Sequence, residues 1–380
     1  MRRLGDSQNT VGRPSRRSVL GLTGAALAAA TLPAPSAAAA ARRPGPGQDG
    51  KPAAGKPGAG KPTDGKPVTG KPAAGKAAAG KVRFDVSRQG TRWLNGRRLH
   101  HTTVMQSFGF DERRRHIYAL QVVAGGVQLP GESRTYTHGE RAKAGDLCLN
   151  KLTSDGTVIG HMYLKGFGHG TAMGVDPDGP SGAVLWTECD ANPKSGYGRA
   201  IGRFPYVEGL VLRGGDPRLA VYRPLPGSTS NTAAIDLQHR RIMVRYGKPG
   251  SLGRFALYDL DAFAHGRFEP LTDFEQPGMD LGLPFQGMTL HGAYAYQMIG
   301  SSYDPDSSTP ERGNARLYCI DLHTGKVVQE QKSQTGNALQ PREPEGLAVL
   351  RTAGPKLCMG FASGPVGGRT FAIYYVPPKR

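Results

Sequence analysis

Residues 106–123 read QSFGFDERRRHIYALQVV, and this stretch predicts two antiparallel strands joined by a charged turn. Its first half recurs four times along the chain, as TAMGVD from Thr171, NTAAID from Asn231, QGMTLH from Gln286 and EGLAVL from Glu345. The copies are spaced by roughly 55 to 65 residues, a period typical of a repeated sheet-sized unit.

Two further apolar runs follow each copy, often with a turn and a fourth run after them. The second runs are HIYALQVV, GAVLWTECD, RRIMVRYG, AYAYQMIG and PKLCMGFAS, and the third runs are DLCLNKL, RAIGRFPYV, RFALYDLD, ARLYCIDL and RTFAIYYV. Five sheets of about four strands at a regular period predict an all-β fold, a five-bladed β-propeller. We expect its blades at about residues 102–165, 166–225, 226–280, 281–338 and 339–376.

The last blade shows only three strand-like runs, so a strand from elsewhere is needed to complete it. Residues 81–86, KVRFDV, alternate as a strand does. We expect them to pair with the last blade and close the ring, because an unpaired terminal blade would leave a row of open backbone donors and acceptors.

The first 41 residues predict an export signal of the twin-arginine type. Arg16 and Arg17 are followed by SVLG, a weakly apolar run over residues 19–32 and a tract of small residues. The alternative is an ordinary Sec signal, and no cysteine follows the apolar run to indicate a lipoprotein anchor. The sequence therefore predicts a secreted protein, extracellular or associated with the cell wall, without a transmembrane segment.

Residues 42–81 predict a disordered linker between this signal and a propeller domain over residues 82–380. From Gly50 the chain repeats a five-residue unit, GKPxx in most copies, with a lysine in every unit and no large apolar side chain. Such a segment is either a plain spacer or a polycationic tether that adsorbs to an anionic envelope through many weak contacts.

The formal net charge of +19 favours an anionic partner. Export argues against nucleic acid, whereas an anionic cell-wall polysaccharide or teichoic acid offers similar phosphate electrostatics outside the cell. The four cysteines match no zinc or redox spacing, so we expect mostly buried free thiols and no metal or other cofactor. They are Cys148, Cys189, Cys319 and Cys358.

The aligned copies place polar residues at one register of the inner strands, near one mouth of the central channel. They are Gln106, Thr171, Asn231, Gln286 and Glu345. His169 precedes Thr171 by two residues and is expected on the same face. We interpret these six residues as a candidate ligand-binding set; the alternative is that they only hydrogen-bond neighbouring strands and ordered water.

The connections between second and third strands emerge on the same side and supply further candidates. They are Tyr136, Tyr197, Arg199, Tyr303 and Asp304. Aromatic rings beside fork-shaped polar partners suit the recognition of sugars or phosphates. Trp186, on a second strand, is expected in the core instead.

An enzymatic alternative is a hydrolase or lyase that acts on a polysaccharide at the channel mouth. A hydrolase needs paired carboxylates, and a lyase needs a base beside a charge neutraliser. The carboxylates on offer are Glu188, Asp190, Glu343 and Glu345, and the lyase set is His169, Tyr197 and Arg199. Neither a G-x-S-x-G elbow nor H-E-x-x-H occurs, so we assign no catalytic residue.

Several segments resemble a known family, namely VMQSFGFDERRRHIYALQVV, LPGESRTY, GDLCLNKL, YLKGFGHG, LWTECDA and SGYGRAI. They are similar to exported actinobacterial proteins called teichoic acid biosynthesis protein C or phage baseplate protein, which are grouped with the β-propeller of staphylococcal phage receptor-binding proteins. The resemblance covers residues 90–376 and is densest in the first two blades. It implies a five-bladed propeller and, for the phage members, attachment to wall teichoic acid; it transfers no catalytic residue.

We therefore expect a secreted, envelope-associated propeller that binds an anionic, teichoic-acid-like glycopolymer. The competing hypotheses are the enzyme described above and a phage-tail-like component, which the export signal disfavours.

Overall fold

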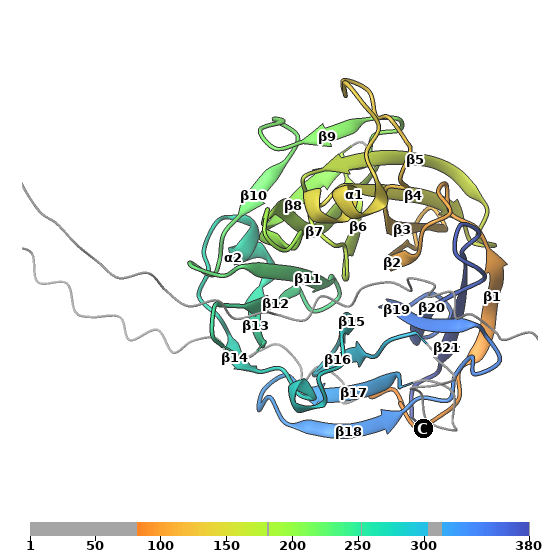
Figure 1. The fold of residues 1–380 in the computed structure, drawn as a ribbon. Helices are drawn as coiled ribbons and strands as arrows, with labels where there is room; N and C mark the ends of the chain where they lie inside the picture. Colours follow the sequence, from red (N-terminus) through yellow and green to blue (C-terminus); the bar gives the residue numbers. More distant parts are fainter. Residues whose placement is uncertain (1–81, 181, 252, 303–313, 380) are drawn as a thin grey trace, which may run out of the picture. The chain divides into compact units, whose positions relative to one another are not determined.

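The computed structural model describes residues 82–180, 182–251, 253–302 and 314–379. These residues form five sheets, antiparallel except for one strand pair, which are arranged around an axis and confirm the five-bladed β-propeller (Figure 1). The predicted export signal and linker lie outside the described residues, as do Tyr303 and Asp304. Among the described helices, none combines the length and apolar character that crossing a bilayer would require.

The chain segment that forms blade two also contributes a strand to the outer edge of blade one. Blade one contains β2 (Met105–Asp111), β3 (His116–Val122), β4 (Leu147–Thr153) and β5 (Val158–Lys165). Blade two contains β6 (Gly174–Gly179), β7 (Gly182–Ala191), β8 (Gly198–Pro205) and β10 (Ala220–Tyr222). Between β8 and β10 the chain crosses back as β9 (Val211–Arg213), which pairs in parallel with β5. The sequence analysis did not predict this fifth strand of blade one, which ties the two blades together.

Blades three and four have four strands each, from the axis outwards. Blade three contains β11 (Ser230–Asp236), β12 (Arg241–Gly247), β13 (Arg254–Asp259) and β14 (Thr272–Glu275), with the short helix α2 (Leu260–Ala264) after β13. Blade four contains β15 (Phe285–His291), β16 (Tyr294–Ile299), β17 (Arg316–Asp321) and β18 (Val327–Lys332), preceded by the 3-10 turn η1 (Met279–Leu281). A second short helix, α1 (His138–Ala144), belongs to the connection between β3 and β4 of blade one.

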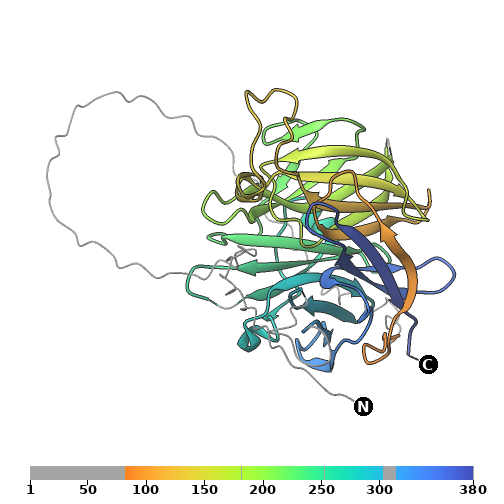
Figure 2. The same ribbon diagram turned by 45° about the vertical axis from the view of Figure 1, so that its right-hand side comes forward.

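Blade five closes the ring, but with a different segment from the one predicted. It contains β19 (Pro341–Leu350), β20 (Lys356–Ser363) and β21 (Thr370–Val376), and β1 (Thr91–Arg97) pairs with β21 as its outer strand (Figure 2). The assignment of residues 81–86 to this strand was wrong, because only Phe84 pairs there, in a single bridge to Pro378. The side chain of Asp85 accepts hydrogen bonds from the backbone and hydroxyl of Ser87, which turns the chain before a strand can form.

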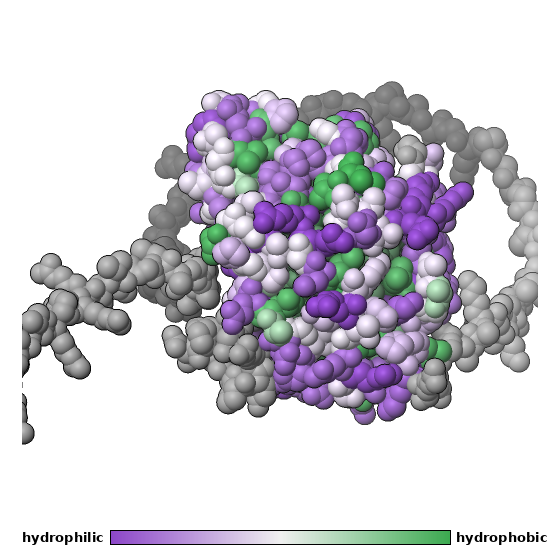
Figure 3. All heavy atoms as spheres, turned by 90° about the vertical axis from the view of Figure 1, so that its right-hand side faces the viewer, coloured by the Kyte–Doolittle hydropathy of each residue, from purple (hydrophilic) through white to green (hydrophobic). Residues whose placement is uncertain are grey.

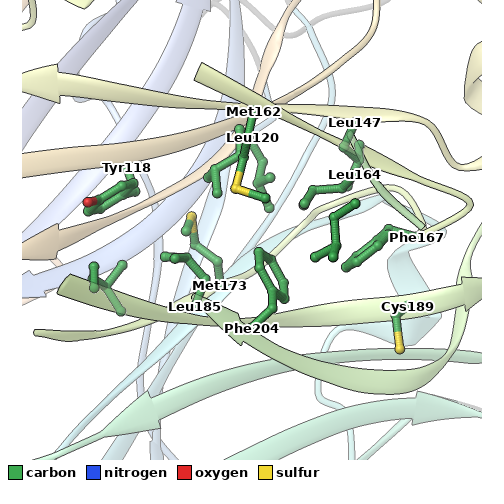
Figure 4. Packing of buried hydrophobic residues seen from close by; sticks show 14 of the residues in the cluster. Tyr118, Leu120, Leu147, Met162, Leu164, Phe167, Met173, Leu185, Cys189 and Phe204 are labelled. Atoms are coloured by element: carbon green, nitrogen blue, oxygen red, sulfur yellow. The ribbon is translucent and has the colours of Figure 1, made fainter. Parts of the chain in front are cut away.

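The hydrophobic core lies between neighbouring blades. The cluster between blades one and two draws Leu120 and Met162 from one sheet and Leu185 and Phe204 from the next (Figure 4). The four cysteines are buried free thiols, as predicted. Trp186 is also in the core, as predicted, and its ring stacks on Tyr222 at 5.5 Å.

The small residues of the repeated motif are explained by close packing near the axis. A Cβ atom added to Gly346 would lie 2.8 Å from Cα of Ser107, and one added to Gly287 would lie 2.8 Å from Cα of Gly346. Contacts this short are sterically forbidden, so the inner strands of blades one, four and five can meet only because glycine occupies these positions.

Candidate functional site

One end of the axis, where the inner strands begin, carries an aromatic pair from blade two. The ring of His169, just before β6, lies 5.1 Å from the ring of Tyr197, just before β8. Burial lowers the pKa of His169 to about 4, and His138 of α1 lowers it further. His169 is therefore neutral at neutral pH, while Tyr197 remains 37% exposed and can meet a ligand.

The charge at this end comes from Arg245, which the sequence analysis missed. It is half-buried on β12, opposite Thr232 of β11. Its Nε donates to Oε1 of Gln276 at 2.8 Å, and its guanidinium lies 4.7 Å from the centre of the Phe285 ring. Burial lowers the pKa of Arg245, and Tyr197 and Glu188 lie close enough to oppose that shift. Within the described part of the chain Arg245 makes no ion pair, so Glu188 compensates its charge only from beyond ion-pairing distance.

The buried carboxylate of Glu188 holds the backbone segments that carry His169 and Tyr197. Its two carboxylate oxygens accept hydrogen bonds at 2.6 Å from the backbone N–H groups of Gly170 and Gly198, and the carboxylate is fully buried. Burial raises the pKa of Glu188, whereas these donors and the N–H groups of His169 and Thr171 lower it. The carboxylate thus fixes the segment that carries His169 against the start of β8, which carries Tyr197 at its edge.

Blade five contributes two carboxyl groups, from Glu343 and Glu345. Burial raises the pKa of both, and the neighbouring Glu343 raises that of Glu345 further, to well above its usual range. Glu345 is only 2% exposed, and its Oε2 is buried without a hydrogen-bond partner among the described residues. A raised pKa favours the protonated form of a carboxyl group, which can donate a proton.

The other residues of the predicted ring differ in how far their hydrogen bonds are satisfied. Gln286 donates to the carbonyl of Gly300 at 2.9 Å, within its own blade. Asn231 donates to Ser228 at 3.0 Å, but its Oδ1 is buried without a partner in the described chain. Thr171 is 6% exposed and Gln106 is half-buried. Gln286 therefore serves its own sheet, which was the structural alternative.

The loop candidates also differ in whether other side chains already engage them. The ring of Tyr136 is covered by cations, with the guanidinium carbons of Arg134 and Arg141 at 4.0 and 4.7 Å from its centre. Arg199 is ion-paired with Asp190 at 2.7 Å. Of the loop candidates that the structure describes, only Tyr197 contacts a residue of the predicted ring. Tyr303 lies outside the described residues.

A sequence signal for Arg245 was present but not used. In RRIMVRYG the last arginine stands between Val244 and Tyr246, both of which are buried. A charged residue inside an apolar strand of a repeated blade indicates a special role. Gln276 and Phe285 lie in less regular segments and gave no such signal.

At the opposite end of the axis an ion pair joins blade five to blade three. Nη2 of Arg351, which follows β19 of blade five, lies 3.1 Å from Oδ1 of Asp236, at the end of β11 in blade three. Asp236 is fully buried and also accepts from Nδ1 of His239 at 2.8 Å and from the N–H of Gly292, in blade four, at 3.1 Å. Burial raises the pKa of Asp236, but Arg351 and its other partners bring it below its usual value. Asp236 and Arg351 at this end are thus paired with each other.

The five blades with their closed ring match a known domain family over residues 104–375, described as the phage 5-bladed beta propeller receptor binding platform domain. The chain belongs to this family. It is 26% identical over 285 residues to the putative major teichoic acid biosynthesis protein C of Bacillus subtilis (strain 168), covering 72% of this chain and 59% of that protein. The structure is similar to the tail fiber of Staphylococcus aureus phage P68, with a TM-score of 0.55 and 18% identity over 78% of this chain and 52% of the fiber chain. The chain thus spans less than two thirds of either relative.

Proposed function

We propose that this propeller binds an anionic, teichoic-acid-like glycopolymer of the bacterial cell wall at the end of the axis that carries Arg245. The observation that carries the proposal is a half-buried guanidinium that makes no ion pair with a described carboxylate. Membership of a receptor-binding platform family and similarity to a protein named for teichoic acid biosynthesis support the same kind of ligand.

The geometry suits a phosphodiester beside a sugar or polyol. The bond from Nε to Gln276 and the stacking on Phe285 hold the guanidinium in one orientation, which leaves its terminal N–H groups for phosphate oxygens. The exposed ring of Tyr197, supported by His169, offers an apolar face to the neighbouring carbon skeleton. Charge-assisted hydrogen bonds of this kind contribute about 1.5 to 3 kcal/mol each.

We further propose that the chain reaches the envelope by export and that the lysine repeat strengthens its adhesion. The support is in the sequence, where Arg16 and Arg17 precede a weakly apolar run and lysines recur every five residues from Lys51 to Lys81. Many weak contacts to an anionic surface raise the effective concentration of the propeller near its ligand.

A second candidate function, hydrolysis of the same polymer, rests on Glu345. A buried carboxyl group whose pKa is raised, with a neighbouring carboxyl from Glu343, has the properties of a general acid. In this case the polymer would become shorter during incubation.

The test is a binding assay with the full chain on purified cell walls, before and after extraction of teichoic acid. We expect Arg245→Met to weaken binding by about 10- to 100-fold, the loss of one or two charge-assisted hydrogen bonds. Arg241→Met is the matched control, because Arg241 lies at the other end of the same strand and donates to the carbonyl of Gly292.

Three outcomes decide between the hypotheses. Binding that does not change on extraction, or wild-type affinity in a folded Arg245→Met variant, would refute the glycopolymer site. Shortening of the polymer, abolished by Glu345→Gln, would establish the hydrolase instead. Melting temperatures of both arginine variants separate lost contacts from lost folding.

A further inference from the structure

A pocket of about 180 Å³ lies at the far end from Arg245, where the first and last blades meet. It is formed by the end of β2, the turn that leads into β3, the β4–β5 turn, β1 and the segment that follows β19. The side of the molecule that carries β1 and β21 is largely hydrophilic, with hydrophobic side chains in small separate groups (Figure 3). The pocket beside β1, which contains several apolar side chains, therefore differs from the surface around it.

The floor of the pocket is apolar and partly aromatic. The rings of Trp93 and Phe110 lie 5.7 Å apart, and Ile117 and Leu350 complete the floor. Trp93 is half-buried, and its indole N–H has no hydrogen-bond partner among the described residues. A flat apolar surface with a free donor at its edge is suited to the face of a sugar ring.

Some polar side chains of the lining have hydrogen-bond partners and others have none among the described residues. Glu112 accepts hydrogen bonds from the backbone N–H groups of Arg351 and Thr352, so its carboxylate is occupied. By contrast, Nδ1 of His116 is buried without a partner in the described chain, and burial lowers the pKa of His116, which favours the neutral imidazole. The hydroxyl of Ser154 also makes no hydrogen bond to a described residue.

The lining carries two carboxylates, Asp111 and Glu112, and one cation, Arg115. Glu112 is paired with Arg351, whose Nη1 lies 3.9 Å from its Oε1. The other acidic side chain of the lining, Asp111, is fully buried and bonded to Arg114 at 3.0 Å. Arg115 is exposed and makes no ion pair with a described residue. The pocket thus combines an aromatic floor, two unused hydrogen-bonding groups and one unneutralised cation.

We infer that this pocket binds a single acidic pyranose, such as a hexuronate residue. Its apolar face lies on Trp93, its hydroxyls reach His116 and Ser154, and its carboxylate faces Arg115. The volume of about 180 Å³ suits one sugar ring and is too small for an oligosaccharide to be enclosed. This site is separate from the Arg245 end, so the chain would contact an envelope polysaccharide at two places.

The two tryptophans of the chain give a direct readout. Trp186 is in the core, so Trp186→Phe leaves Trp93 as the single fluorescent reporter in the full chain. The probes are methyl glucuronide and methyl glucoside, titrated at pH 7. We expect the glucuronide to bind with a dissociation constant in the low millimolar range and the glucoside at least about tenfold more weakly.

Arg115→Asn is the decisive variant, because asparagine tolerates the left-handed conformation that Arg115 adopts, with φ of 58°. It should weaken glucuronide binding by about tenfold. Arg240→Asn is the matched control, with a φ of 51° in the equivalent turn of blade three, and should change nothing. Binding detected by calorimetry should also be abolished by Trp93→Ala.

Equal binding of the two glycosides, or wild-type affinity in Arg115→Asn, would overturn the acidic assignment. No change in Trp93 fluorescence and no calorimetric heat with either probe at about 50 mM would overturn the pocket as a sugar site. Arg245→Met should leave these titrations unchanged, so this inference and the proposed function fail independently.

Discussion

Replacing Glu188 with alanine tests whether this carboxylate stabilises the fold or takes part in binding or cleaving the polymer. The change removes the acceptor of two hydrogen bonds at 2.6 Å, from Gly170 and Gly198, and leaves both N–H groups buried. At about 1.5 to 3 kcal/mol for each charge-assisted bond, the free energy of unfolding should fall by about 3 to 6 kcal/mol. For a propeller of this size that corresponds to a loss of about 5 to 10 °C in melting temperature.

The assay is thermal unfolding followed by circular dichroism, with two comparisons. Glu188→Gln keeps one acceptor oxygen and should lose roughly half as much stability. Asp178→Ala, in the same blade, breaks an ion pair to Arg113 whose two side chains are 67% and 70% exposed, and should cost under about 1 kcal/mol. A Glu188→Ala variant that melts like the wild type but no longer binds or cleaves the polymer would refute the scaffold role and make Glu188 a functional carboxylate.

Three further changes probe the frame of the propeller. Arg351→Ala removes the partner of the buried carboxylate of Asp236 and should lower the free energy of unfolding by about 2 kcal/mol in a urea titration. Unchanged stability would show that the ion pair across the axis does not stabilise the fold. Burial lowers the pKa of His101 to about 4 from about 6.5 in the unfolded chain, so the unfolded state binds the proton first as pH falls. His101 therefore has no effect on the free energy of unfolding above about pH 6.5 and lowers it by up to about 3 kcal/mol by pH 4. Denaturation curves of His101→Gln at several pH values should show a smaller dependence of this free energy on pH; an unchanged dependence would contradict the assignment. Gly346→Ala would place a Cβ 2.8 Å from the backbone of β2 at a φ of 81°, and should cost about 2 to 4 kcal/mol by calorimetry; a neutral substitution would show that the inner strands can separate.

The sequence was sufficient to predict the blades because each one repeats the same order of inner, second and third strands. It was insufficient at the closure, since residues 81–86 alternate and residues 91–97 do not, yet the turn that Asp85 imposes keeps the first segment from forming the strand. The site shows the same limit. Period and register led to His169, which lies beside Tyr197, but Arg245 becomes a candidate only when its lack of an ion pair within the described residues is known.

Asp236 and Arg245, at opposite ends of the axis, differ in how their charges are satisfied. This difference supports the proposed site beside Arg245 over one at the ring of aligned polar residues. Asp236 is ion-paired, whereas the described residues that hydrogen-bond to or stack on Arg245, namely Gln276 and Phe285, are neutral. The contacts of Arg245 and Tyr197 lie on blades two to four, so the ligand should lie to one side of the axis and not along it.

This arrangement separates two predicted residues by experiment. Tyr197→Ala removes an exposed ring and should weaken cell-wall binding by about tenfold, since one stacked aromatic contributes about 1 to 2 kcal/mol. Gln286→Ala removes a side chain already bonded to Gly300 and should lower stability slightly without changing affinity. If the pull-down shows the reverse order, with Gln286 the more important, the ligand lies on the axis and the ring of aligned residues is the binding site after all.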